Sequence, residues 1–167
     1  LKKLDEIAVE IEKKRQAQKN AMLLSDPSPE DCLATVQTRS IALWCREPND
    51  TDFVSVRLGT GSVPFAVSLD YPKEQLMEDD ELRKKPGELY HASKNVDDVP
   101  VCCDIRSNGV VGVLGTPEVT RTQMQNMILH LTTHHCYTEL KIVCIYNEKD
   151  QKELSWLADL PHTRSAQ

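Results

Sequence analysis

The sequence predicts an α/β fold, in which an N-terminal helix and a β-rich segment at about residues 41–71 precede a strand–helix–strand unit. Residues 1–24 carry apolar side chains at helical spacing and contain no glycine or proline. Two short apolar runs, at 110–115 and 139–146, flank an amphipathic stretch of helical period. That order is typical of a βαβ unit with a right-handed crossover.

Composition sets the first limits on function. The chain has 167 residues, of which 40% are hydrophobic, which suits one domain with a real core. The net charge of −6 argues against a nucleic-acid surface, because phosphate binding needs clustered positive charge. No run approaches the roughly 18 apolar residues of a membrane span, and no signal peptide is visible. The chain opens within a helical pattern at Leu1, so we expect a piece of a larger protein.

The six cysteines predict reduced, buried thiols in a cytosolic protein. No C-x-x-C pair occurs, and three cysteines, Cys102, Cys103 and Cys144, lie in apolar β-like runs. Neighbouring residues of a strand point to opposite faces, which argues against a redox pair at Cys102 and Cys103.

The first helix is predicted over residues 1–24, with a narrow apolar seam that fades into polar residues beyond Ile11. Such a helix suits a stalk, a linker or a packing arm. A second helix is predicted to run to about Thr38. Ser28 is a good N-cap, Pro29 fits the first helical position, and acidic residues follow in the first turn.

The β-rich segment is predicted to be a hairpin or a close pair of strands. Residues 53–58 and 63–69 alternate apolar and polar side chains on either side of Gly59-Thr60-Gly61. Residues 72–98 are polar, and we expect solvated loops there with room for a short helix.

The α/β part follows this linker. It consists of a strand at 99–105, a hairpin turn at Asn108-Gly109, a buried strand at 110–115, a helix at 122–135, a strand at 139–146 and a short helix at 150–162. The loop between the second strand and the first of these helices is where the chemistry is expected.

That loop partly matches the phosphate-loop pattern G-x-x-x-x-G-K-[ST]. Gly115 and Thr122 match, while Thr120 replaces the second glycine and Arg121 replaces the lysine. A working loop wraps phosphates with backbone N–H groups, so each loss of glycine or of a donor weakens it.

The loop interior weakens anion binding further. Pro117 removes a donor N–H, Glu118 adds a carboxylate, and Val119 is stiff. The apolar run that ends at Tyr146 is not followed by an acid placed to hold magnesium. The sequence therefore predicts a degenerate phosphate loop on a Rossmann-like frame, with no catalytic residue, bound cofactor or metal. The alternative is a plain strand-to-helix turn.

The histidines form another candidate group. His130 and His134 lie one helical turn apart and His135-Cys136 follows, which is the start of a zinc-site pattern. No second ligand pair is spaced to complete it, so a structural role at the helix end is favoured. His162 is expected to lie at a terminus or an interface.

Several segments together carry a family resemblance. "LWCREPNDTDFVSVRLGTGSVP" (43–64) resembles a segment of EssC-type type VII secretion ATPases, in the FtsK/SpoIIIE superfamily. "SDPSPEDCL" (25–33), "ILHLTTHHCYTELKIVCIYNEKD" (128–150) and "WLADLPH" (156–162) resemble further segments. Cys136 departs from the family's usual serine, and Cys45 from its usual charged residue.

The resemblance implies a place in a larger machine. Residues 1–24 would be a juxtamembrane stalk helix and residues 25–167 a degenerate ATPase-like domain ahead of the ATPase domains proper, at the cytoplasmic face of the bacterial cell membrane. ATP and Mg²⁺ would bind only in those downstream domains. The motor would export WXG100-type proteins, and its partners would be other secretion subunits, including a ubiquitin-like cytosolic component.

Three functions fit these observations. The first is a non-catalytic coupling module. The second is a weak ATPase that uses Arg121 and Thr122, with its magnesium-holding acid beyond residue 167. The third is a structural adaptor that binds a partner through residues 53–69 or the stalk helix.

Overall fold

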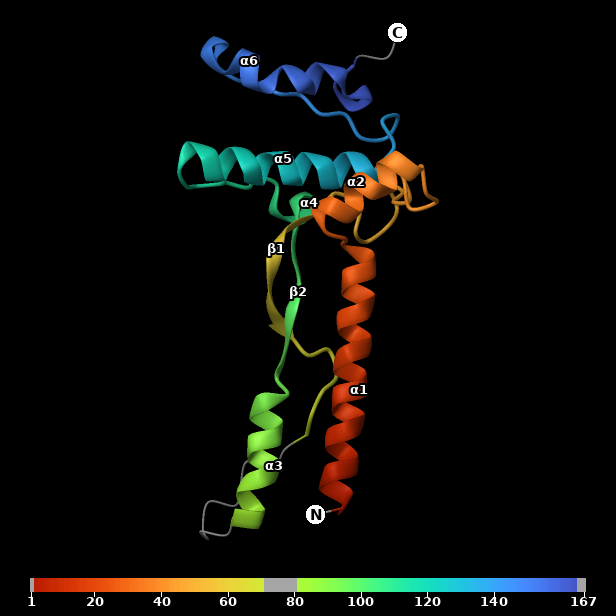
Figure 1. Ribbon diagram of the computed structural model, residues 1–167, viewed down its shortest axis with the longest axis vertical. Coiled ribbons are helices and arrows are strands. Elements are labelled where there is room, and N and C mark those ends of the chain that lie inside the picture. The colour runs from red at the N-terminus through yellow and green to blue at the C-terminus, as the bar shows by residue number, and fades with distance from the viewer. Residues whose placement is uncertain (1, 71–80, 165–167) are drawn as a thin grey trace. The chain divides into compact units, whose positions relative to one another are not determined.

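A computed structural model describes residues 2–70 and 81–164 of the chain (Figure 1). The helices are α1 (Lys2–Ser25), α2 (Pro29–Thr38), α3 (Glu81–Ala92), α4 (Ile105–Asn108), α5 (Pro117–His134) and α6 (Gln151–Leu154). The strands are β1 (Ser55–Pro64) and β2 (Asn95–Asp104), and short 3₁₀ helices are η1 (Glu148–Asp150), η2 (Ser155–Asp159) and η3 (Pro161–Thr163). None of the described helices is long and apolar enough to cross a membrane.

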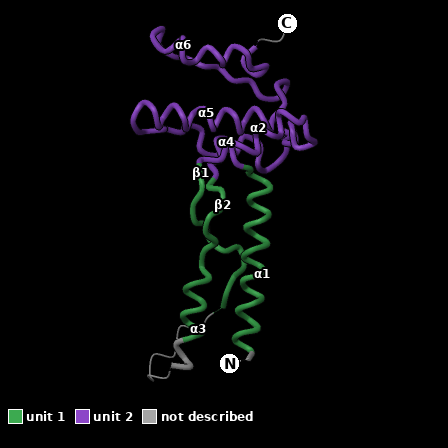
Figure 2. The backbone as a smooth tube through the Cα atoms, viewed as in Figure 1, with its two compact units in different colours: residues 1–27, 59–101 green, residues 28–58, 102–167 purple. Residues whose placement is uncertain are grey.

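The chain divides into two compact units, shown in different colours in Figure 2. Unit 1 contains Leu1–Pro27 and Gly59–Val101, and unit 2 contains Ser28–Leu58 and Cys102–Gln167. Both boundaries inside the sheet fall within strands, so β1 and β2 each contribute residues to both units. Helix α1 shares its unit with residues 59–101.

In unit 1, polar side chains of α1 bind the backbone at the ends of the strands. The Arg15 guanidinium donates to the Asn95 carbonyl at 2.8 and 3.1 Å. The Gln18 amide donates to the Pro64 carbonyl at 3.1 Å and accepts from the Ala66 N–H at 2.9 Å. The predicted helix is confirmed, and polar side chains beyond Ile11 contact the rest of its own unit.

The sheet has two strands, β1 and β2. The Ile105 N–H donates to the Val54 carbonyl at one end, and the Phe65 N–H donates to the Lys94 carbonyl at the other, so the strands run antiparallel. The predicted hairpin within 53–69 is wrong, because β1 continues through Gly59-Thr60-Gly61 without turning.

The physical reason lies at Gly61. A Cβ placed on Gly61 would lie 2.9 Å from Cγ2 of Val101 in β2. This glycine therefore allows the two strands to pack closely. A sequence alone does not distinguish such a glycine from one that forms a turn.

Within the predicted polar stretch at 72–98, helix α3 occupies 81–92, in agreement with the short helix expected there. The prediction is wrong at its end, because β2 begins at Asn95 and Val96 is buried. Residues 71–80 of that predicted loop lie outside the described residues.

Unit 2 is organised around α5. Ser28 caps α2 through a reciprocal pair of hydrogen bonds with Asp31, as predicted. The helix predicted at 122–135 is confirmed and begins earlier, at Pro117. The hairpin turn predicted at Asn108-Gly109 is wrong, because Asp104 and Gly109 cap the short helix α4 there.

The two strands predicted on either side of α5 are not formed. Residues 110–115 and 139–146 belong to no strand, because no described backbone pairs with them as a neighbouring strand. The structure is a mixture of helix and sheet, and a Rossmann-like phosphate-loop fold is not confirmed.

One side of α5 carries the apolar core of unit 2. Ile128 packs with Leu154 and Leu157, and partly buried side chains close the cluster, namely Met124, Ile142, Cys144, Trp156 and Leu160. Helix α2 packs against α5 as well. All six cysteines are free; Cys32 is buried, whereas Cys45 and Cys102 are exposed, so burial of Cys102 was wrongly predicted.

Substitution of Gly61 tests the strand packing. We expect Gly61→Ala to lower the free energy of unfolding by about 1–3 kcal/mol, because the new methyl group overpacks Val101. Gly59→Ala is the matched control in the same strand, where an added Cβ meets nothing within 4 Å. Chemical denaturation measures both, and an equal effect of the two substitutions would contradict the packing role.

Candidate functional site

The predicted phosphate loop is the start of helix α5. The Thr116 hydroxyl accepts from the Val119 N–H, and Pro117 takes the first helical position. The Thr120 hydroxyl donates to the carbonyls of Thr116 and Pro117 at 3.0 and 3.1 Å. Among the described glycines only Gly109 has a positive φ, so Gly115 does not adopt the left-handed conformation. This segment is a capped helix start rather than an open anion cradle.

Arg121 stands where the phosphate-loop lysine would stand, and it forms an ion pair with Glu153 of α6. The two groups approach to 2.5 Å, and both side chains are partly exposed to solvent. A phosphate at Arg121 would have to displace or face this carboxylate. Thr122, the predicted magnesium-binding hydroxyl, is exposed.

A cavity of about 410 Å³ lies beside this helix start. Its lining consists of Val113, Pro117, Thr120, Arg121, Met124, Asp150 and Leu154. Of the four predicted phosphate-loop residues, Thr120 and Arg121 therefore line the cavity. Asp150 adds a carboxylate that balances the positive charge of Arg121, so the lining has no excess positive charge to attract a polyphosphate.

The opposite end of α5 carries a dense set of hydrogen bonds that sequence reasoning did not single out. The Trp44 backbone N–H donates to the Thr133 carbonyl at 2.8 Å, and the Trp44 indole donates to the Thr132 carbonyl at 3.2 Å. The Arg46 N–H donates to the His134 carbonyl at 2.9 Å. The last carbonyls of a helix have no partner within the helix, so this loop caps α5. We call residues 44–55 the capping loop.

His135 joins the capping loop to the helix through both ring nitrogens. Nδ1 lies 2.9 Å from the Leu131 carbonyl, which can only accept, so Nδ1 carries the proton. Nε2 is then the acceptor for the Val54 N–H at 3.0 Å. The ring also packs edge-on against Phe53 at 4.8 Å between centroids. The neutral imidazole is therefore the form that the structure holds.

Arg46 supplies the buried charge of this cluster. Its side chain is 4% exposed, and Nε lies 2.9 Å from a carboxylate oxygen of Asp52. A second guanidinium nitrogen donates to the Ser55 carbonyl at 3.0 Å. Trp44 and Val54, at the two ends of the region, both have φ of 57°, a conformation that costs a non-glycine residue energy. The hydrogen bonds to α5 hold both residues in it.

The remaining histidines take structural positions. The His162 ring donates from Nε2 to the His135 carbonyl at 2.8 Å. His134 Nδ1 lies 2.8 Å from the His130 carbonyl. Within residues 2–70 and 81–164, no group of three or more His, Cys, Asp or Glu side chains is arranged to hold a metal ion.

Burial changes the pKa of two groups at this end of α5. Burial lowers the pKa of His135, with the neighbouring Arg46 charge acting in the same direction. Burial raises the pKa of the Cys32 thiol, which is hydrogen bonded to Thr133. Both ring nitrogens of His135 are occupied by backbone hydrogen bonds, and the raised pKa of the Cys32 thiol disfavours the thiolate, so neither group is placed to act as a general base or a nucleophile.

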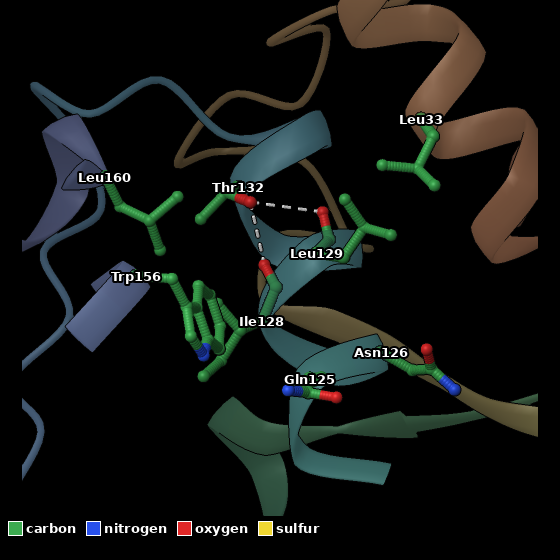
Figure 3. A pocket seen from close by; sticks show the side chains of 8 residues that line it. All are labelled: Leu33, Gln125, Asn126, Ile128, Leu129, Thr132, Trp156 and Leu160. Carbon is green, nitrogen blue, oxygen red and sulfur yellow. Dashed lines mark hydrogen bonds between the residues drawn. The ribbon is translucent and has the colours of Figure 1, made fainter. Parts of the chain in front are cut away.

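A groove of about 330 Å³ lies between α2, α5 and the C-terminal segment (Figure 3). It is lined by Leu33, Gln125, Asn126, Ile128, Leu129, Thr132, Trp156 and Leu160. None of these side chains titrates, so the groove offers apolar contact and no acid–base chemistry.

Comparison with known proteins adds the biological context. No protein-family model matches the chain. The chain is 26% identical over 161 residues to the ESX secretion system protein EccC of Geobacillus thermodenitrificans, and 26% identical over 160 residues to the type VII secretion system protein EssC of Staphylococcus aureus. It is 25% identical over 160 residues to the ESX secretion system protein YukB of Bacillus subtilis.

The chain is homologous to a segment of type VII secretion proteins. Each match covers 95% of this chain and 11% of the relative's length.

The segments that carry the type VII resemblance meet at the C-terminal end of α5. Trp44, Arg46 and Phe53 come from one segment, His135 from a second and His162 from a third, and all of them cap or contact that helix end. A sequence alone could have pointed to these residues only through the resemblance, because no spacing rule links positions so far apart.

The His135 contacts predict a pH dependence of stability. Because the folded protein lowers the His135 pKa, the unfolded chain takes up the proton first, and stability is lost as pH falls below the unfolded value of about 6.5. Thermal unfolding should therefore give a lower melting temperature at pH 5.5 than at pH 7.5.

The control for this prediction is an exposed histidine. His135→Gln should lower the melting temperature at pH 7.5 and reduce its change with pH. His91→Gln, at an exposed position of α3, should leave the change intact. A pH profile that His135→Gln leaves unaltered would contradict the assignment.

Proposed function

We propose that the chain is a non-catalytic coupling and assembly module of a type VII secretion motor that exports WXG100-type proteins. Its homology to EccC, EssC and YukB supports a role in that machinery. In this proposal α1 is the juxtamembrane element on the cytoplasmic face of the membrane. The partners are other secretion subunits, including a ubiquitin-like cytosolic component, and ATP and Mg²⁺ bind elsewhere in the parent protein.

The observation that carries the non-catalytic part is the Arg121–Glu153 ion pair at a capped helix start. A phosphate loop needs a free cation and a row of open backbone donors. Here Glu153 compensates the cation, Pro117 removes one donor, and Thr116 occupies another through its hydroxyl. The degenerate-loop interpretation of Gly115, Thr120, Arg121 and Thr122 remains a prediction, and this arrangement favours it.

The coupling part rests on how α5 is held. Towards its start the helix packs against Leu154 of α6 through Met124 and Ile128, and at its end it is joined to the capping loop by Trp44 and Arg46. A helix fixed at both ends moves with its neighbours as one body, so a displacement at one end reaches the other. Such a block suits the transmission of assembly state better than chemistry.

An adaptor role is the second candidate, and the apolar groove in Figure 3 favours it. The Trp156 indole nitrogen lies buried there without a hydrogen-bond partner among the described residues. A docked apolar side chain would cover the groove.

Calorimetric titration with Mg-ATP tests the non-catalytic part. We expect no binding heat for residues 1–167 at nucleotide concentrations up to about 1 mM, well above the micromolar affinity of a working site. Arg121→Ala should change nothing. Micromolar binding that Arg121→Ala abolishes would favour the weak-ATPase alternative instead.

An export assay with the full-length protein tests the coupling part. Arg46→Met removes the partner of Asp52 and should cost roughly 2–4 kcal/mol of stability, less than for a fully buried pair because Asp52 is partly exposed. At matched protein level we expect export to fall while ATP hydrolysis by the full-length protein continues.

Two controls accompany this assay. Arg121→Ala and Lys152→Met, the latter at an exposed position of α6, should leave export within about twofold of the unaltered protein. Loss of hydrolysis together with export in Arg121→Ala would overturn the proposal, since it would place Arg121 in catalysis.

A further inference from the structure

Two segments of unit 2 expose aliphatic side chains that ordinarily lie in the interior of a sheet. Val110 and Leu114 are 89% and 97% exposed, and Val143 and Ile145 are 85% and 95% exposed. Valine and isoleucine favour strands because their branched side chains pack on a pleated surface. Isolated exposed aliphatic residues are common, but of the six large hydrophobic side chains in the described part of the chain that are at least 85% exposed, four lie in these two runs.

Residues 139–146 already have the side-chain pattern of a strand. Leu140, Ile142 and Cys144 are half-buried, and Ile142 and Cys144 pack against the core of unit 2, whereas Lys141, Val143 and Ile145 between them are exposed. This period of two is the pattern of an extended strand with one face on a core. For this segment to be a strand of a sheet, it needs a neighbouring strand that pairs with its backbone and residues that bury its outer face.

The backbone of this segment is almost unpaired. The Ile142 N–H donates to the His162 carbonyl at 3.0 Å, and this is the one backbone hydrogen bond that residues 141–146 make with described residues. Residues 111–115 make none with the described part of the chain. Unpaired N–H and C=O groups at the spacing of a strand can all form hydrogen bonds only with another extended backbone. The exposed edge therefore indicates a polypeptide strand as its partner.

We propose that residues 139–146 and 110–115 form strands of a sheet whose other strands come from the full-length protein outside residues 1–167. The homologous proteins supply the length of chain this requires, since the aligned region covers only 11% of each. The added strand pairs along the open edge at Lys141, Val143 and Ile145, and the chain that carries it covers their outer face. The inference does not depend on the proposed function.

Hydrogen exchange on the full-length protein tests this inference. The Val143 and Ile145 amides, and those amides of residues 111–115 that face a neighbouring strand, should be protected there to the same degree as the paired amides of β2, because sheet hydrogen bonds slow exchange. The same amides in residues 1–167 alone should exchange at the rates of unpaired backbone, while β2 stays protected and reports that the chain is folded. Fast exchange of both segments in the full-length protein overturns the proposal.

Variants at the outer face provide a second readout. Ile145→Thr keeps a strand-forming residue and should lower the melting temperature of this domain in the full-length protein by about 4–8 °C, with little change in residues 1–167. The matched control is Val9→Thr on α1, a position that is 71% exposed. An equal effect of Ile145→Thr in both chains overturns the proposal.

A second copy of the chain is the competing occupant, and concentration distinguishes it. If residues 1–167 associate, and exchange at 143–146 slows as their concentration rises, the strand comes from another copy and the proposal is wrong. Protection that appears only in the full-length protein, at every concentration, supports it.

Discussion

The final carbonyls of helix α5 are the constraint around which unit 2 is arranged. An α-helix leaves its last carbonyls without internal partners, and burial of such groups is costly unless a donor is supplied. Here the donors are the Trp44 indole and the backbone N–H groups of Trp44 and Arg46. Because these groups lie in a loop far away in sequence, the capping loop can meet the helix only in one register. The buried Arg46–Asp52 pair and the neutral His135 ring then fix the loop's shape.

The same constraint explains why this end of the helix is rich in histidine without being a metal or catalytic site. Three of the rings have a backbone partner: His134 contacts the His130 carbonyl, His135 bridges Leu131 and Val54, and His162 donates to His135. Imidazole suits this work because one ring can donate and accept at once. A charged ring would lose the acceptor, so the cluster depends on neutrality rather than on proton transfer.

Local signals in the sequence were sufficient for helices α1, α2 and α5. The Ser28 cap with Pro29, and the apolar stripe of residues 122–135, both correspond to helices in the structure. Contacts between residues far apart in the sequence could not be predicted from these local signals. Gly61 looked like a turn residue because its contact with Val101 lies in a distant strand, and the capping role of Trp44 depends on a helix end nearly ninety residues away. The runs at 110–115 and 139–146 have the composition of strands, but a strand exists only when another backbone pairs with it.

The candidate site shows the same division. Comparison with the phosphate-loop pattern identified the right stretch of chain to examine, and the unfavourable residues Pro117 and Glu118 could be recognised in it. The partner of Arg121 could not, because Glu153 reaches it from a separate element. Charge compensation between elements depends on the fold, so sequence reasoning could predict a weakened anion site without naming the group that compensates Arg121.

The distance in sequence between Trp44 and Thr132 has a consequence for biosynthesis. The two residues are 88 positions apart, so the ribosome releases the capping loop well before it has made the helix that the loop closes. During that interval Trp44 and Phe53 of the nascent chain lack their final neighbours. The entropy cost of closing the long loop between the capping loop and α5 arises only after α5 has been made. Chaperones that recognise aromatic residues in emerging chains therefore have a defined window on this protein, which shuts when α5 leaves the exit tunnel.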